Sequence, residues 1–453
     1  MHRFNGYIFD SGRQLLYNEN IPTEVISIIN DNYDNANNKP KPYDLQLNSD
    51  AMCMNQIAIN RAGVCLTYNC NLRCRYCGYS SDECSSHRID FSDVKVFIKD
   101  IVLRRTIKKL LSTTDDPLEI DFTGGGEPTY DWELFEKTIL FVKKICLDNC
   151  IPVHLNLTTN GILSEQQIDF ISGNFDHVMI SYDGLPETQN KNRVSPYKKT
   201  TSPTVENTIC RLANNGVPIT IRSTIWQSDF DKMKEMFNYV FSLVQAGKAV
   251  TWSLYPVLFE GRAVKQIKKQ EDTTYGRFLE KYLELVDYIA NNHGADHLNH
   301  VEVPLFNNSM CELFCGAHRV NQPWLLPDKS IVTCIESKED KTVIGKISDG
   351  TVQYYENYQD RLLKITQKKY NECQECIAYC ICKGGCPIWH LRVDTDIQEP
   401  LECCLQKEYW KYVLNSLVTD GHSLGWKLRK IAIPEVQGWE VFKIEKEKRN
   451  ETK

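Results

Sequence analysis

The chain has 453 residues, of which 42% are hydrophobic and 25% are charged, and its formal net charge is −6. This length suits two or three domains, and the acidic balance argues against a general role in binding nucleic acid or anionic membranes. No apolar run is long enough to span a membrane, and the stretch MHRFNGYIFDSGRQ lacks the apolar core of a signal peptide. We therefore expect a cytoplasmic protein without a membrane segment or a nucleic-acid partner.

The first 56 residues precede any cysteine cluster. NGYIFD (5–10) and QLLYN (14–18) are typical of short strands. PTEVISIINDNY (22–33) has the pattern of a helix with Pro22 near its first turn. We predict a short α+β cap over residues 1–56.

Residues 57–295 alternate between strand and helix patterns. Strands are predicted at 61–68, 118–124, 153–160, 177–183, 218–225 and 249–257. Apolar residues recur at helical spacing in 93–111, 131–147, 165–172, 204–216, 228–244 and 275–292. Six β-then-α units predict an α/β fold with a parallel sheet, curled into a partial (β/α)6 barrel.

Four motifs follow the ends of the first four predicted strands. They are a cysteine cluster after the first strand, then TGGGEPT (123–129), TTNG (158–161) and SYDG (181–184). Ligands of parallel sheets bind at the carboxyl ends of the strands, so these motifs are expected to share one mouth of the barrel.

Cysteine is frequent: of the 19 cysteines, all but Cys53, Cys146, Cys150 and Cys210 gather in 65–84, 311–334 and 373–404. A large chain without an export signal does not need disulfides for stability, so this clustering favours metal ligation. We divide the remainder into a cysteine-rich domain over 296–404 and a helical tail over 405–453.

The first cluster contains Cys70, Cys74 and Cys77, spaced C-x3-C-x2-C. Three thiolates leave one coordination position open, either on a catalytic zinc or on one iron of a 4Fe–4S cluster. The glycines Gly124, Gly125 and Gly126 precede Glu127 in a turn that permits close backbone approach. Glu127 supplies an acceptor for a cationic amine, which an amino acid chelating an open iron would need.

With these motifs the chain resembles the radical S-adenosylmethionine (SAM) superfamily over roughly residues 57–404. The resemblance implies that Cys70, Cys74 and Cys77 hold a 4Fe–4S cluster and that the Gly124–Glu127 motif binds the methionine amino group. It also implies that one electron from the cluster cleaves the sulfonium, giving a 5′-deoxyadenosyl radical that removes hydrogen from a substrate. Tyr76 stands where the family has an aromatic residue beside the cofactor.

The segment SYDGLPETQNKNR resembles the S-x-D-G…NR segment of the subfamily with a C-terminal cluster domain. This resemblance assigns Ser181 and Arg193 to the ribose or carboxylate of the cofactor. The alternative for either residue is a simple turn with a surface arginine.

The last cluster, CQECIAYCICKGGC, resembles the SPASM domain, which holds two auxiliary 4Fe–4S clusters. Upstream, Cys315 and Cys334 fit a further element of that pattern, with Lys329 in place of its usual glycine. The family pattern assigns one cluster to Cys311, Cys315, Cys334 and Cys386, and the other to Cys373, Cys376, Cys382 and a last cysteine. Cys403 and Cys404 compete for that last place, and we prefer Cys404. Zinc ribbons are the alternative for C-x2-C pairs.

The SPASM subfamily mostly modifies peptides and proteins, and three functions follow. The first is a peptide maturase that installs a thioether or carbon–carbon cross-link. The second is an anaerobic sulfatase maturase, a family that places an aspartate directly after the ligand cysteine at the position of Cys334, where this chain has Ile335. The third is a non-enzymatic zinc-ribbon scaffold. No general base can be named for the first function.

The cofactors implied by the resemblance are three 4Fe–4S clusters and SAM. The expected partners are a peptide or protein substrate and a low-potential electron donor such as flavodoxin or ferredoxin. The first 56 residues resemble the start of a peptide-recognition domain, which binds a leader segment as an added strand. A plain cap on the barrel is the alternative for this segment.

Overall fold

The computed structural model describes most of residues 59–303 and a smaller part of the chain beyond them. The described ranges are 59–79, 88–111, 116–244, 250–258, 261–265, 273–303, 322–336, 342–355 and 401–419, with single positions between 373 and 388 and short strands near both ends.

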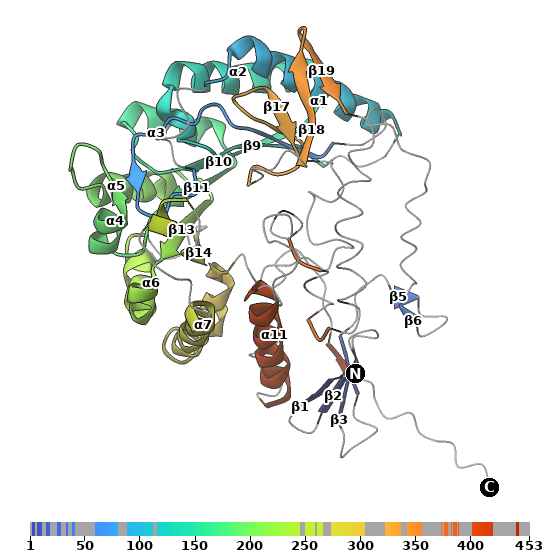
Figure 1. Cartoon of the computed structure of the whole chain (residues 1–453), viewed down its shortest axis with the longest axis vertical. Coiled ribbons are helices and arrows are strands. Elements are labelled where there is room, and N and C mark those ends of the chain that lie inside the picture. Colours follow the sequence, from blue (N-terminus) through green and yellow to red (C-terminus); the bar gives the residue numbers. More distant parts are fainter. Residues whose placement is uncertain are drawn as a thin grey trace.

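A curved parallel sheet forms the centre of the molecule (Figure 1). Its strands are β7 (Arg61–Val64), β9 (Leu118–Phe122), β10 (Val153–Thr159), β11 (His177–Ser181), β13 (Ile219–Ile225) and β14 (Val250–Pro256), with β15 (Val301–Glu302) added at the edge. Neighbours in this order pair in parallel, for example Asn156 with both Asp121 and His177. The six predicted barrel strands and their parallel arrangement are confirmed.

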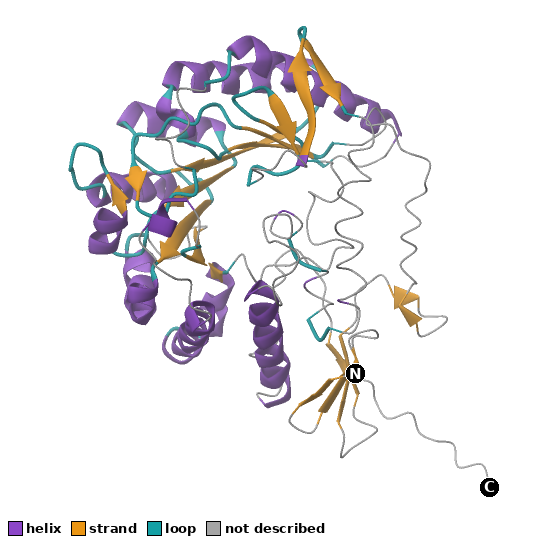
Figure 2. Ribbon diagram, in the orientation of Figure 1, coloured by secondary structure: helices purple, strands orange, loops and turns teal. Residues whose placement is uncertain are grey.

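Helices cover the outer side of this sheet (Figure 2). They are α1 (Phe91–Leu111), α2 (Trp132–Asp148), α3 (Glu165–Asn174), α4 (Pro186–Asn192), α5 (Ser202–Asn214), α6 (Met233–Ser242) and α7 (Thr273–Asn292). Short 3-10 turns are η2 (Pro128–Tyr130), η3 (Gln227–Lys232), η4 (Gly261–Lys265) and η5 (Ala295–His300).

The start of α2 shows how the sequence sets a helix boundary. Asp131 precedes the helix, and its carboxylate accepts a hydrogen bond from the Leu134 amide at 3.1 Å. This bond satisfies one of the amides that have no partner within the helix. Leu134, Phe135 and Ile139 then bury one face of α2 in the main core. The helix therefore begins where a cap and an apolar face coincide.

The sheet continues past β7 into a segment far along the chain. β16 (Trp324–Leu325) pairs in parallel with β7 and is followed by the antiparallel β17 (Ser330–Val332), β18 (Val343–Ser348) and β19 (Thr351–Tyr354). A Cβ atom on Gly63 would lie 1.9 Å from Cε3 of Trp324, so only glycine fits beneath this indole ring. The sheet thus runs across the predicted boundary at residue 296 and carries Cys334 toward the barrel.

A second sheet joins the two ends of the chain. Its order is β1 (His2–Phe4), β2 (Tyr7–Asp10), β3 (Leu15–Asn18), β4 (Val25–Ile28) and β20 (Val441–Lys443). The two predicted strands are confirmed, but the helix predicted over 22–33 is wrong at 25–28. The run VISI is short and rich in β-branched residues, and antiparallel partners on both sides outweigh its ambiguous periodicity. A two-residue pair, β5 (Tyr33–Asp34) with β6 (Lys39–Pro40), lies in the predicted loop.

Helix α11 (Leu401–Thr419) begins four residues before the predicted boundary of 405, and within the predicted helical tail β20 (Val441–Lys443) is a strand. Helix α11 packs against α7, where the rings of Tyr282 and Tyr409 are 6.3 Å apart and Tyr412 donates a hydrogen bond to Asp287 at 3.0 Å. Among the described residues, no helix combines the length and apolarity that crossing a bilayer requires.

Candidate active site

The loop after β7 carries the three cysteines of the first cluster. Arg73 holds this loop closed, because its guanidinium donates to the carbonyls of Cys70 at 2.8 Å and Leu72 at 3.0 Å. β8 (Arg73–Cys74) pairs with β12 (Arg193–Val194), with Cys74 opposite Arg193. The loop is therefore fixed to the barrel on its far side by a short antiparallel ribbon.

The three thiols lie within electrostatic range of one another. Burial raises the pKa of Cys70 to about 11 and that of Cys74 to about 12, and neighbouring cysteines of the cluster add to both shifts. Both thiols are therefore protonated at neutral pH, and ligation of iron would release these protons. Among the described residues, no three His, Cys, Asp or Glu side chains are grouped as ligands of one metal ion. The C-x3-C-x2-C order of these cysteines suits a cubane cluster, whose thiolates bind different irons.

The predicted glycines lie directly against the cysteine loop. The amides of Gly126 and Glu127 donate to the carbonyls of Thr67 at 2.9 Å and Asn69 at 2.8 Å. A Cβ atom on Gly126 would lie 2.0 Å from the Asn69 carbonyl oxygen. Glycine at this position allows the two loops to pack backbone against backbone, as the sequence motif predicts.

The Glu127 carboxylate is buried, with 3% of the residue exposed, and it accepts hydrogen bonds from neutral donors. The hydroxyls of Thr129 and Thr159 donate to Oε1 at 2.7 Å each, and the Asn160 amide donates to Oε2 at 2.7 Å. Burial raises the pKa of Glu127, and the opposing causes are these hydrogen bonds rather than a cation. The ammonium group of an amino acid would supply the missing positive charge, so this carboxylate fits the amino end of SAM.

Asn160 links the Glu127 carboxylate to the cysteine loop. Its side-chain amide donates to Asn71 Oδ1 at 2.6 Å and lies 3.8 Å from Cys70 Sγ. The sequence analysis placed the TTNG motif at this mouth but gave Asn160 no role in the site. The signal was present in the TTNG motif, because an asparagine at a strand end beside two other motifs is well placed to bind a ligand.

A second buried carboxylate, Asp183, holds the other side of the mouth. Tyr76 donates its hydroxyl to Asp183 Oδ2 at 2.6 Å, and Arg193 Nε donates to Oδ1 at 3.0 Å. The Arg193 guanidinium also lies 5.4 Å from the centre of the Tyr76 ring. Burial lowers the pKa of Arg193, but Asp183 and its neighbours outweigh this and leave it raised. Arg193 therefore stays charged and supports this turn through its ion pair. Asp183 was not among the predicted site residues.

Ser181 ends β11 and is half-buried at the same mouth. The structure thus brings together Cys70, Cys74, Cys77, Tyr76, Gly124, Gly125, Gly126, Glu127, Ser181 and Arg193 at the carboxyl ends of neighbouring strands. Contact of Ser181 and Arg193 with a cofactor stays a prediction.

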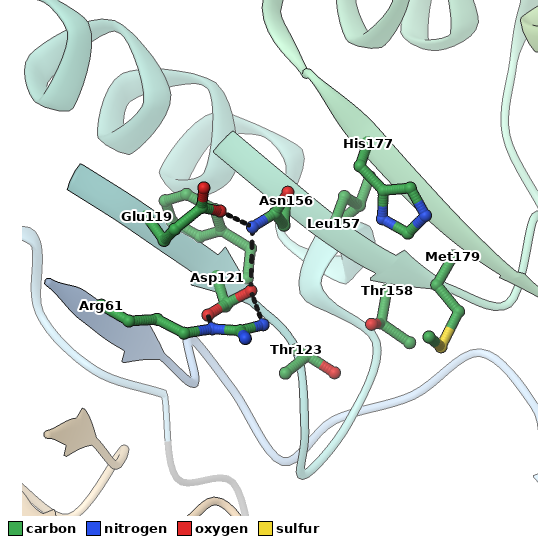
Figure 3. A pocket seen from close by; sticks show the side chains of 10 residues that line it. Arg61, Glu119, Asp121, Thr123, Asn156, Leu157, Thr158, His177 and Met179 are labelled. Atoms are coloured by element: carbon green, nitrogen blue, oxygen red, sulfur yellow. Dashed lines mark hydrogen bonds and ion pairs between the residues drawn. The ribbon is translucent and has the colours of Figure 1, made fainter. Parts of the chain in front are cut away.

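A polar cavity of about 230 Å³ lies inside the barrel (Figure 3). On one side, the Arg61 guanidinium pairs with Asp121, with Nη2 donating to Oδ1 at 2.8 Å. The Asn156 amide bridges Glu119 at 2.6 Å and Asp121 at 3.2 Å. His177 and Met179 form the opposite side. The cavity is lined by β7, β9, β10 and β11, and the sequence reading did not identify it.

The comparison with protein families decides what this arrangement is. Residues 64–240 match the model of the Radical SAM superfamily. The chain carries a radical SAM domain. It is 26% identical to a cysteine-type anaerobic sulfatase-maturating enzyme of Clostridium perfringens over 373 residues, which are 78% of this chain and 96% of that protein.

Solved structures share the fold of this radical SAM enzyme. One is native anSMEcpe with bound AdoMet and Kp18Cys peptide, with a TM-score of 0.61, 21% identity, and coverage of 80% of this chain and 98% of that chain. Another is Streptococcus suis SuiB bound to precursor peptide SuiA, with a TM-score of 0.50, 14% identity, and coverage of 75% and 74%. The predicted α/β radical SAM fold is confirmed.

The C-terminal cysteines of this radical SAM enzyme are described only in part. Cys373, Cys376, Cys382, Cys386 and Cys334 are half-buried, whereas Cys311 and Cys315 lie outside the described residues. Burial raises the pKa of Cys382, and the neighbouring Cys403, Cys373 and Cys376 add to this shift. Cys403, on α11, therefore lies with the thiols of the predicted second auxiliary cluster. The side chain of Cys404, the predicted last ligand, lies outside the described residues, so that assignment stays a prediction.

Proposed function

We propose that this radical SAM enzyme is a peptide maturase that removes hydrogen from a peptide side chain and forms a thioether or carbon–carbon cross-link. The bound cluster and SAM supply the 5′-deoxyadenosyl radical. Glu127 holds the ammonium group of the cofactor, and Asn160 orients this carboxylate beside the cysteine loop. The polar cavity inside the barrel, whose lining includes Thr123 directly before Gly124, would take the substrate side chain.

The proposal rests on the position of the Ile335 side chain. A Cβ atom on Gly124 would lie 2.1 Å from Ile335 Cγ1, and Tyr79 donates its hydroxyl to the Ile335 carbonyl at 2.8 Å. The residue after Cys334 therefore lies against the glycine turn of the cofactor site and presents an alkyl group there. An alkyl group cannot take a proton from an oxidised substrate, which a carboxylate at this position would do. This favours products that form without a base at position 335.

A peptide substrate is supported by the names of the structural neighbours, which include complexes with the Kp18Cys peptide and with the precursor peptide SuiA. The N-terminal sheet supports recognition of a leader segment, because β1 ends the order of that sheet and an added strand would pair there. We also propose three 4Fe–4S clusters, the second auxiliary cluster being held by Cys373, Cys376, Cys382 and Cys403.

The second candidate function is formylglycine formation on a sulfatase, which the similarity to sulfatase-maturating enzymes favours. The two candidates differ in their products. Formylglycine is an aldehyde and reacts with hydrazides, whereas a cross-linked peptide has lost two hydrogens, keeps its sulfur and contains no aldehyde.

The experiment is anaerobic reconstitution followed by reaction with dithionite, SAM and the Kp18Cys peptide or other cysteine-containing peptides. We expect 5′-deoxyadenosine, about twelve irons per chain, no hydrazide-reactive product, and a peptide that has lost two hydrogens. An aldehyde on Kp18Cys would replace our proposal with the second candidate. The Ile335→Asp variant, compared with Ile335→Leu, tests whether a carboxylate here redirects the enzyme toward the aldehyde.

A further inference from the structure

A basic segment lies next to the cysteine loop in an otherwise acidic chain. Between Glu187 and Glu206 the sequence contains Lys191, Arg193, Lys198 and Lys199 and no acidic residue, although the net charge of the chain is −6. Asp183 neutralises Arg193. Lys191 lies 3.7 Å from the carboxylate of Asp229. The unpaired positive charge of this segment therefore belongs to Lys198 and Lys199.

The segment after β12 projects into solvent. Residues 196–200, PYKKT, are all exposed, and Tyr197 is 81% exposed. A turn closed by the Lys198 amide and the Ser195 carbonyl at 3.0 Å holds this tip, with Lys198 in the left-handed region at φ 55°. Within the described part of the chain, neither Lys198 nor Lys199 forms an ion pair. Figure 1 shows this loop between β12 and α5 at the edge of the molecule. An exposed aromatic ring beside two unpaired ammonium groups is typical of an interaction surface.

A short antiparallel strand pair connects this tip to the loop that carries the cluster cysteines. β12 pairs with β8, so that Val194 lies opposite Arg73 and Arg193 opposite Cys74. Three Cα steps beyond Val194 and one strand spacing place the Tyr197 Cα at most roughly 17 Å from the Arg73 Cα. A protein bound at residues 196–200 would therefore lie close to the loop that carries the cluster cysteines.

We propose that Tyr197, Lys198 and Lys199 form the docking surface for a small acidic flavoprotein of the flavodoxin type, which delivers the electron for SAM cleavage. In this step one electron leaves the reduced flavin of the partner and enters the cluster held by Cys70, Cys74 and Cys77. No bond forms or breaks in the docking complex. The inference rests on the radical SAM part of the proposed function and not on the identity of the peptide product.

Charge and shape both support an acidic flavoprotein. The ammonium groups attract an acidic partner against the repulsion of the remaining chain, which accelerates encounter at low ionic strength. The Tyr197 ring supplies a rigid, amphipathic anchor at the centre of the contact. A flavin edge exposed at the surface of the partner offers a planar apolar group for such a ring.

The test compares two charge-reversed variants of the reconstituted protein. Lys198→Glu/Lys199→Glu alters the proposed surface, and Lys143→Glu/Lys144→Glu makes the same charge change on the exposed face of α2. Flavodoxin binding is measured by calorimetry at low and at physiological salt. The rate of 5′-deoxyadenosine formation is measured with reduced flavodoxin and, separately, with dithionite.

We expect the Lys198/Lys199 variant to raise the flavodoxin dissociation constant by about tenfold or more at low salt and to weaken its salt dependence. Its rate with dithionite should match that of the parent protein, and the Lys143/Lys144 variant should match the parent throughout. Tyr197→Ala should weaken binding without changing the salt dependence.

Three results would overturn the inference. The first is unchanged flavodoxin binding in the Lys198/Lys199 variant. The second is an equal loss of rate with dithionite, which would mean that the substitutions damage the β8–β12 ribbon. The third is a rate that depends on this loop only when a ferredoxin is the donor. Failure of the proposed peptide product would leave these measurements unaffected, because cofactor cleavage is followed without peptide.

Discussion

The mouth of the barrel contains two buried carboxylates that differ in what neutralises them. Asp183, with 1% of the residue exposed, is paired with Arg193 and accepts the Tyr76 hydroxyl. Glu127 is similarly buried, yet among the described residues it accepts hydrogen bonds only from hydroxyls and backbone amides. A buried charge without a counter-ion is costly, so a fold that keeps one there gains most when a ligand supplies the missing cation. The Asp183 turn is therefore a structural support, whereas the Glu127 turn is prepared for a ligand.

The largest effect is expected from a substitution of Glu127, the buried carboxylate that has no cationic partner among the described residues. Glu127→Gln removes the charge and keeps the volume, so we expect SAM affinity to fall by about 100-fold or more, as when one partner of a buried ion pair is lost. The unfolding free energy of the cofactor-free protein should not fall. Calorimetry with SAM checks the first result, and Glu133→Gln on the exposed face of α2 is the control. An unchanged SAM affinity would remove Glu127 from the cofactor site.

Asp183→Asn should lower the stability of the cofactor-free protein, which Glu127→Gln should not. It leaves the buried Arg193 guanidinium without a counter-ion, so we expect the unfolding free energy to fall by about 3 kcal/mol. Denaturant unfolding of the cofactor-free protein measures this loss. Asp183→Asn combined with Arg193→Met should recover part of the loss, because it removes the uncompensated charge as well. A single variant as stable as the parent would show that the ion pair contributes little.

The glycines of the two turns provide a second contrast. Alanine at Gly126 would bring Cβ to 2.0 Å from a backbone carbonyl, whereas at Gly184 it would meet the flexible side chain of Met236 at 2.7 Å. We expect Gly126→Ala to displace the cysteine loop and lower the iron retained after reconstitution severalfold. Gly184→Ala should cost about 1–2 kcal/mol of stability, since its φ of +86° is unfavourable for alanine. Measuring the iron content and the unfolding free energy of both variants separates the two effects. Equal iron content in the Gly126→Ala and Gly184→Ala variants would contradict this prediction.

A smaller effect follows from the raised pKa of Glu127. Its folded-state pKa lies above the unfolded value, so its protonated form contributes stability at low pH, and this contribution is lost as pH rises through the folded pKa. Without cofactor, the parent should therefore lose stability relative to Glu127→Gln as pH increases from below about 4.3. Unfolding of both proteins across this range gives the difference, and SAM should reduce it. A difference that shrinks with rising pH would contradict the assigned burial cost.

The smallest effect lies away from both carboxylates. Lys329 adopts φ +71° in the turn before Cys334, where the family pattern has glycine, and its ammonium lies 3.0 Å from Asp93. Lys329→Gly relieves the left-handed strain and loses a half-exposed ion pair, so we expect a net stabilisation of up to about 1 kcal/mol. Thermal unfolding measures it, with Lys346→Gly on β18 as a destabilising control.

Local sequence determined the parallel strands, the helices between them and the glycine–glutamate turn. Alternating β and α patterns leave few topologies, and a run of three glycines before Glu127 reports directly where two backbones approach closely. The cysteine spacing likewise marked the loop that β8 and β12 now hold. Each of these features depends on neighbours in the chain or on the rule that strand ends share one edge.

Only the tertiary structure decided which groups meet across the mouth and where distant segments pair. The sequence placed the TTNG and SYDG motifs at one edge, but the hydrogen bonds of Asn160 and Asp183 and the contact of Ile335 with Gly124 depend on how separate strands are packed. The strand at Val25–Ile28 replaced a predicted helix because β3 and β20 pair with it, and β20 is more than four hundred residues away along the chain. Long-range pairing thus outweighed local periodicity where the local pattern was short. That no cation pairs with Glu127 among the described residues likewise became visible only in the folded structure.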